Sequence, residues 1–297
     1  MDLLTRTRLK MTAKREKLLV EGVNFKLKSF NFFQHNGKIL LKINDDFELS
    51  FSVMDKKCCK IERKVKGLFR REFYINKTHI KTAFASFKSI ILDGNLHFER
   101  GNVFLPIYKR KVKKFDGFIQ TDSIIFAPQK NEANDKVGKD VSRWIRKCDP
   151  KTLQNVSIEI SGPIRHISRI PDIYNKTTFS CKSMCDITDN QLKKFGNPKK
   201  GRNCDCCPDI INITSRYVTA NGINQFLSKI SQNYHPIGSK FTINSIKTLS
   251  YRKIMRKLNF VSGMCEIHAI PMIDGNLLEI GFTGTGINCF IRRRTHY

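Results

Sequence analysis

Four cysteines in the second half of the chain have the spacing of a metal site. Three residues separate Cys181 from Cys185, two separate Cys204 from Cys207, and eighteen lie between the pairs. Thiolates this close in sequence can turn back onto one ion, and Zn²⁺ takes four such ligands at tetrahedral corners. Segment 175–208 has few apolar residues, so a metal would supply folding energy there. The pattern predicts a structural zinc knuckle. The alternative is a set of free thiols.

Two histidines and a basic loop accompany the cysteines. His166 and His235 are candidate substitute ligands, because the first cysteine spacing is three residues rather than two. The loop between the pairs holds two glycines, Gly196 and Gly201, and a group of cations: Lys193, Lys194, Lys199, Lys200 and Arg202. A flexible basic knuckle of this kind suits phosphate.

Positive charge runs through the whole chain. The 297 residues include 54 Lys and Arg against 26 Asp and Glu, which gives a net charge of +28. Each cation that neutralises a phosphate releases a condensed counterion, so this composition favours nucleic acid as the partner. Further basic runs contain Lys56, Lys57, Lys60, Arg63, Lys64, Arg70 and Arg71; Lys109, Arg110, Lys111, Lys113 and Lys114; Arg252, Lys253, Arg256 and Lys257; and Arg292, Arg293 and Arg294.

Aromatic residues stand beside several of these cations. Bases stack on aromatic rings while cations follow the phosphate backbone, a combination typical of proteins that bind single strands. The candidates for stacking are Phe69, Phe73, Tyr74, Tyr108 and Phe115. The alternative for each of them is a place in the core of a β-rich domain.

No motif in the sequence indicates catalysis. The HExxH, HxE…PCxxC, Walker A and GxSxG patterns do not occur. A metal nuclease needs clustered carboxylates, and the nearest approach is Asp45, Asp46 and Glu48, which fit a hairpin turn better. We therefore expect a protein that is not an enzyme.

The order of predicted elements indicates an α+β protein. We expect a basic N-terminal arm over 1–20, a barrel- or sandwich-like β-rich domain over 21–127, a linker over 128–139 and a mixed α/β domain over 140–297. Asn36-Gly37 predicts a hairpin turn. Apolar residues at helical spacing predict helices over Thr78–Ile90, Ile223–Ile230 and Ser245–Leu258.

The sequence also predicts a compartment. The first 20 residues have no apolar signal-peptide core, and no stretch has the ~18–20 apolar residues of a spanning helix. We expect an intracellular protein of the cytoplasm or nucleus, which is not secreted, so that its cysteines are reduced.

These observations favour a nonspecific nucleic-acid-binding protein, with RNA or single-stranded DNA as the partner. The residue bias suits an accessory factor of viral type in genome replication or transport. Two alternatives remain open. One is a membrane-associated viral movement or assembly protein, whose cations bind an anionic membrane surface. The other is a metal-dependent nuclease.

Overall fold

The chain folds into two compact units of mixed α/β structure. The computed structural model describes residues 25–66, 70–92, 96–105, 117–128, 137–160, 163–170, 173–198, 208–256, 258, 261–262 and 268–294. The N-terminal unit is Met1–Ser123 with Lys147–Thr152, and the C-terminal unit is Ile124–Arg146 with Leu153–Tyr297. Strand β7 (Gln120–Pro128) contains the division, and helix α5 (Val137–Ile145) begins inside the segment expected to be a linker.

The N-terminal unit contains a mixed sheet with the strand order β6-β1-β2-β3-β4-β5. The strands are β1 (Phe25–His35), β2 (Lys38–Ile43), β3 (Phe47–Val53), β4 (Cys59–Val65), β5 (Arg71–Ile75) and β6 (Leu96–Leu105). Strands β1 to β5 form an antiparallel meander, and β6 pairs with β1 in parallel. The Asn36-Gly37 hairpin is confirmed, because both residues have the positive φ (46° and 74°) that the tight turn requires.

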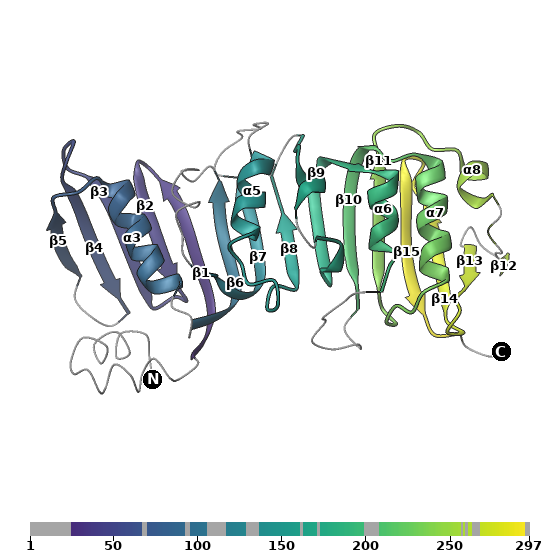
Figure 1. Ribbon diagram of the computed structural model, residues 1–297, viewed down its shortest axis with the longest axis horizontal. Coiled ribbons are helices and arrows are strands. Elements are labelled where there is room, and N and C mark those ends of the chain that lie inside the picture. The colour runs from purple at the N-terminus through teal and green to yellow at the C-terminus, as the bar shows by residue number, and fades with distance from the viewer. Residues whose placement is uncertain are drawn as a thin grey trace. The chain divides into compact units, whose positions relative to one another are not determined.

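Helix α3 (His79–Ile91) covers one face of this sheet (Figure 1). Its apolar residues recur at helical spacing, and the buried Phe84 and Phe87 pack on Phe30 and Phe32 of β1. The predicted helix is confirmed. The expected barrel is wrong, because the sheet is open and α3 supplies the apolar cover that closure would otherwise provide.

The strands of the C-terminal unit are also mixed in direction, and they follow the order β8-β9-β10-β11-β15-β14-β13-β12. The strands are β8 (Asn155–Ile158), β9 (Thr178–Thr188), β10 (Ile210–Tyr217), β11 (Lys240–Ser245), β12 (Val261–Ser262), β13 (His268–Pro271), β14 (Leu277–Phe282) and β15 (Gly286–Arg292). Strands β8 to β11 are parallel, and the remaining pairs are antiparallel.

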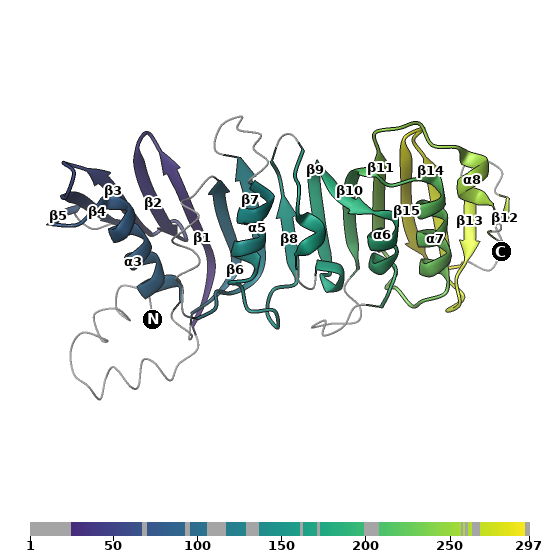
Figure 2. The same ribbon diagram turned by 45° about the horizontal axis from the view of Figure 1, so that its top comes forward.

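The helices of this unit lie on one face of its sheet (Figures 1 and 2). Right-handed crossovers between adjacent parallel strands put α6 (Asp189–Phe195) and α7 (Ala220–Ser231) on the same side. The core between the layers includes the stacked rings of Phe179 and Phe195 and the edge-to-face pair of Phe226 and Phe241.

One predicted helix is much shorter than expected. Helix α7 confirms the prediction over Ile223–Ile230, but α8 covers only Tyr251–Met255. Ser245 belongs to β11, whose pairing with β10 overrides the helical spacing, and Ser250 begins α8 by accepting a hydrogen bond from the Lys253 N–H. Within the described residues, no helix has both the length and the apolar character needed to span a bilayer.

The packing of α3 predicts a large loss of stability for Phe87→Ala. Phe87 is fully buried, and its ring centroid lies 4.6 Å from that of Phe32 and 5.9 Å from that of Phe30. Removing the ring should lower the free energy of unfolding by about 3–5 kcal/mol. Urea unfolding followed by circular dichroism measures this change, and the neighbouring exposed variant Lys88→Ala should stay within about 0.5 kcal/mol.

Candidate nucleic-acid interface

The basic run at 56–71 lies on strands and turns of the N-terminal unit, where several of its cations are neutralised. Lys60 Nζ lies 2.9 Å from Glu72 Oε1 and 3.2 Å from Glu62 Oε1. Arg70 pairs with Glu62 as well. The hydrogen bond with Glu72, followed by that with Glu62, raises the pKa of Lys60. These cations are therefore held by the protein's own carboxylates.

The carboxylate at the centre of this group is bound tightly. Partial burial would raise the pKa of Glu62, but hydrogen bonds from Arg70 and Lys60 outweigh burial and lower the pKa. Strand alternation puts Glu62 and Lys60 on the sheet face that α3 does not cover. This face therefore carries a ladder of mixed charge rather than a purely basic surface.

The described helices, unlike this sheet face, carry many more cations than carboxylates. Nine cations lie on the five described α-helices, and every helix has at least one cation in its last turn. A cation there interacts favourably with the helix dipole, which is the local reason for its position. The nine are Lys81, Lys88, Lys139, Arg143, Lys193, Lys194, Lys229, Arg252 and Lys253.

Only two carboxylates lie on these helices, and the protein uses both internally. Asp140 of α5 is 3% exposed and accepts a 2.7 Å hydrogen bond from Arg143 Nη1. Asp189 of α6 accepts hydrogen bonds from the backbone N–H and hydroxyl of Thr219 at 2.8 Å and 2.6 Å. The outward sides of the described helices therefore present cations without an exposed carboxylate.

The C-terminal unit gathers most of these cations on one side. Helix α6 packs on α7 and α7 on α8, and Asn224 of α7 fixes the end of α8 by donating hydrogen bonds to the carbonyls of Ile254 and Arg256. We use the name helix face for the exposed and half-exposed cations of this side: Lys139, Arg143, Arg146, Lys193, Lys194, Lys229, Arg252, Lys253 and Arg256.

Two tyrosines lie among the cations of the helix face. Lys194 Nζ lies 5.2 Å above the ring centroid of Tyr174, and Tyr251 of α8 is 40% exposed beside Arg252 and Lys253. Burial, followed by the negative charge of Asp186, raises the pKa of Tyr174 to about 12, so its ring is neutral at physiological pH. Both rings are of a type on which bases stack.

The predicted cysteine ligands lie partly in the core. Cys181 and Cys185 are both buried on β9, where a register irregularity opposite β10 adds residues between them. A hydrogen bond with Cys185, followed by burial, raises the pKa of the Cys181 thiol. Cys204 and Cys207 lie outside the described residues, and the described part of the chain contains no cluster of three or more metal-ligating side chains. The zinc knuckle stays a prediction.

His235 connects the two ends of the loop that contains Cys204 and Cys207. Its Nδ1 lies 2.8 Å from Asp209 Oδ2 and its Nε2 lies 3.2 Å from the carbonyl oxygen of Gly196. Both ring nitrogens therefore lie within hydrogen-bond distance of an oxygen atom. His235 is fully buried with both ring nitrogens engaged, which leaves neither nitrogen for the metal that the sequence suggested.

The other residues predicted to bind nucleic acid lie in several different parts of the chain. Phe73 and Tyr74 lie exposed on β5, whereas Arg292, Arg293 and Arg294 end β15 and follow it. Several predicted residues lie outside the described part of the chain: Lys109, Arg110, Lys111, Lys113, Lys114, Lys199, Lys200, Arg202 and Lys257, with the aromatic residues Phe69, Tyr108 and Phe115.

The carboxylates considered for a nuclease do not converge on a metal position. Asp45 and Asp46 lie in the turn between β2 and β3, and Glu48 of β3 pairs with Lys42 at 2.8 Å. A hollow of about 360 Å³ at this turn is lined by these three carboxylates together with Lys42, Lys64 and Lys66, among others. Its lining is of mixed charge.

Sequence reasoning missed several cations of the helix face. Lys139, Arg143 and Lys229 have no cation next to them in sequence, and Arg146 has only Lys147, so no long basic run marks them. The signal that identifies them is the near absence of carboxylates from each amphipathic helix.

No protein-family model, no curated protein and no solved structure matches this chain.

The buried Asp209–His235 pair predicts a large effect for Asp209→Asn. The substitution removes the carboxylate from a buried hydrogen bond with the imidazole of His235, which should lower the free energy of unfolding by about 1–3 kcal/mol. Glu159→Gln is the matched control, because Glu159 pairs with Lys182 at a similar distance (2.9 Å) on the surface. Its cost should be about 0–1 kcal/mol. Equal effects of the two variants in urea unfolding would contradict this account.

Proposed function

We propose that this protein binds nucleic acid without sequence specificity through the helix face of its C-terminal unit. The observation that supports the proposal is the difference in charge between the layers. The described helices carry only two carboxylates, and both are hydrogen-bonded within the protein, whereas several sheet cations, among them Lys60, Lys182 and Arg292, pair with carboxylates. Phosphates that approach the helices meet no exposed carboxylate. Counterion release then supplies affinity that depends on salt rather than on sequence.

The partner in this proposal is RNA or single-stranded DNA. Support comes from Tyr174 and Tyr251, whose rings lie next to Lys194 and Arg252 and can stack on bases while the cations contact phosphates. We propose an accessory role in genome replication or transport, without catalysis by the chain itself.

Neutralising four helix cations tests the proposal. The variant Lys193→Gln/Lys194→Gln/Arg252→Gln/Lys253→Gln should bind a fluorescent 30-nucleotide RNA more weakly. On a plot of the logarithm of affinity against the logarithm of salt concentration, the negative slope should become shallower. Its magnitude should decrease by about 0.7 for each lost contact with a single strand, or about 3 in total. Fluorescence anisotropy measures both quantities.

Four exposed sheet cations provide the matched control. The variant Lys64→Gln/Lys182→Gln/Lys240→Gln/Arg292→Gln removes the same charge from the strands. It should keep most of the affinity of the unmodified chain. Equal losses in the two variants would mean that net charge alone drives binding. Flotation with anionic liposomes that survives nuclease, without RNA binding at low salt, would favour the membrane alternative.

We retain a structural zinc ion as part of the proposal. The support is the spacing of the cysteines and the position of His235, which fastens both ends of the loop holding Cys204 and Cys207. Native mass spectrometry should find one zinc per chain, and this mass should disappear in Cys204→Ser/Cys207→Ser. Protein purified without chelator that contains no zinc would exclude the ion.

A further inference from the structure

Strand β5 is an edge strand with an apolar surface. It pairs with β4 alone among the described strands, and all five of its residues are exposed. Phe73, Tyr74 and Ile75 are 42%, 59% and 36% exposed. Exposed edges normally carry central charges, proline or a bulge that prevent pairing with another strand. In β5 the charged residues, Arg71 and Glu72, lie at one end, and the other three positions are apolar or aromatic.

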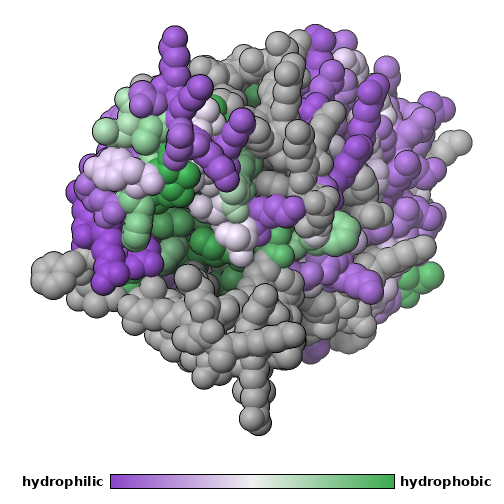
Figure 3. Space-filling model, turned by 60° about the vertical axis from the view of Figure 1, so that its left-hand side comes forward, coloured by the Kyte–Doolittle hydropathy of each residue, from purple (hydrophilic) through white to green (hydrophobic). Residues whose placement is uncertain are grey.

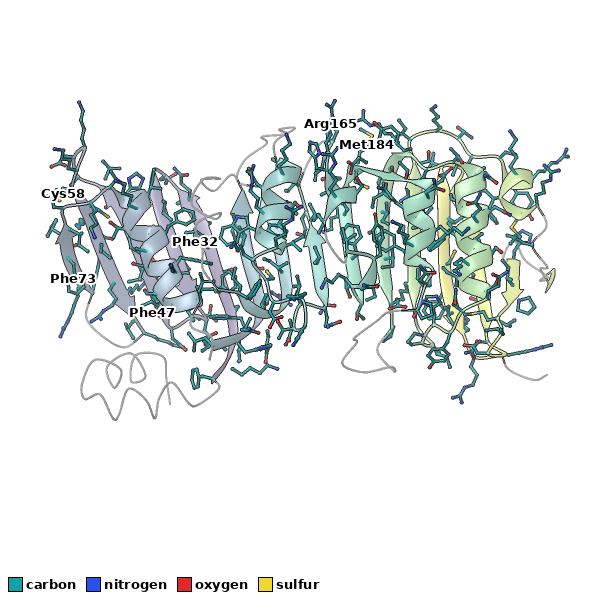
Figure 4. The ribbon with its side chains drawn as sticks, in the orientation of Figure 1. Phe32, Phe47, Cys58, Phe73, Arg165 and Met184 are labelled. Atoms are coloured by element: carbon teal, nitrogen blue, oxygen red, sulfur yellow. The ribbon has the colours of Figure 1, made fainter. Side chains whose placement is uncertain are left out.

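The cover that protects the rest of the sheet stops before β5. Helix α3 packs on β2, β3 and β4. Register puts Phe73 next to Ile61 and Ile75 next to Cys59, on the face that α3 covers further along the sheet. Figure 4 shows Phe73 at the outer edge of the sheet and Phe32 beside α3, and Figure 3 shows apolar surface framed by hydrophilic side chains at this end of the unit.

Uncompensated positive charge lies beside this apolar surface. Arg63 and Arg71 are directly opposite each other across β4 and β5, an arrangement that is unfavourable for like charges. The guanidinium of Arg63 lies 5.7 Å from the ring centroid of Phe73. Among the described residues, no ion pair engages either arginine, whereas Glu72 on the opposite face pairs with Lys60 and Arg70.

We propose that β5 binds an extended segment of a partner protein by strand addition. Backbone hydrogen bonds would continue the sheet, and alternate side chains of the partner would lie on the α3 face. The residue opposite Arg71 is acidic, and the residues opposite Phe73 and Ile75 are apolar. The partner motif is therefore one carboxylate followed, at every second position, by two apolar side chains.

Charge distinguishes this partner from a second copy of the chain. Antiparallel pairing of two β5 strands around Phe73 would put Arg71 opposite Ile75 and bring no carboxylate to either Arg63 or Arg71. Each copy also carries a net charge of +28, so that two chains repel each other. An acidic, extended segment removes both difficulties.

Two labelled peptides test the proposal with the full-length chain. One is fluorescein-Thr-Asp-Thr-Val-Thr-Ile-Thr and the other is its reverse, which together cover parallel and antiparallel addition. One of them should bind saturably in a fluorescence anisotropy titration. Replacing its Asp by Lys should weaken binding at least tenfold.

Three variants locate the site. Phe73→Asp should weaken binding at least tenfold, and Arg71→Glu should reverse the preference, so that the Lys peptide binds better than the Asp peptide. Ile273→Asp is the matched control, because Ile273 is 76% exposed in the C-terminal unit, and it should bind the peptide as the unmodified chain does. Circular dichroism confirms that each variant is folded.

Three outcomes would overturn the proposal. The first is that neither peptide binds saturably, and the second is that Arg71→Glu leaves the charge preference unchanged. The third is that the chain associates with itself, that Phe73→Asp abolishes this association, and that the peptides do not compete with it. The last outcome would identify a second copy as the occupant. Strand addition does not depend on the helix face, so the RNA measurements and the peptide measurements can fail separately.

Discussion

The apolar side of the strands in each unit must be covered, and helices of the same chain provide the cover. In the N-terminal unit Phe84 and Phe87 of α3 pack against Phe30 and Phe32 of β1. In the C-terminal unit the crossover helices α6 and α7 pack on β9 and β11 through Phe195 and Phe226. Burial of these rings is the main stabilising contribution, because each large apolar side chain contributes about 1.5–3 kcal/mol when fully buried.

This layering also decides where charge can lie. The inward side of each helix is occupied by apolar residues, so that its polar residues point to solvent on the side away from the sheet. The described helices place cations there and keep Asp140 and Asp189 for internal hydrogen bonds. The uncovered sheet faces show ion pairs such as Lys60 with Glu72 and Lys182 with Glu159. Separation of charge between the layers, rather than the net charge, supports the proposed interface.

Apolar side chains are exposed at the edge of the N-terminal unit, where the helical cover of the strands ends. Helix α3 packs on β2, β3 and β4, while Phe73 and Ile75 of β5 stay exposed next to two arginines that form no ion pair with any described residue. In the C-terminal unit His235 is completely buried, and both of its ring nitrogens lie within hydrogen-bond distance of an oxygen atom. The first feature suits a partner from outside the chain, and the second fixes the ends of a basic loop.

The sequence by itself determined the local features that depend on neighbouring residues. The Asn36-Gly37 turn, α3 and α7 follow from side-chain period and turn chemistry, and the positive charge follows from composition. Only the tertiary structure decided which charges lie next to each other. The register between β4 and β5 brings Lys60 to Glu72 and Arg63 to Arg71, and sequence spacing does not reveal this register. It also shortened α8, since pairing of Ser245 in β11 outweighed helical spacing. Local patterns fix the type of an element, but register and layering are long-range properties, and they determine whether a charge is neutralised, buried or presented to a partner.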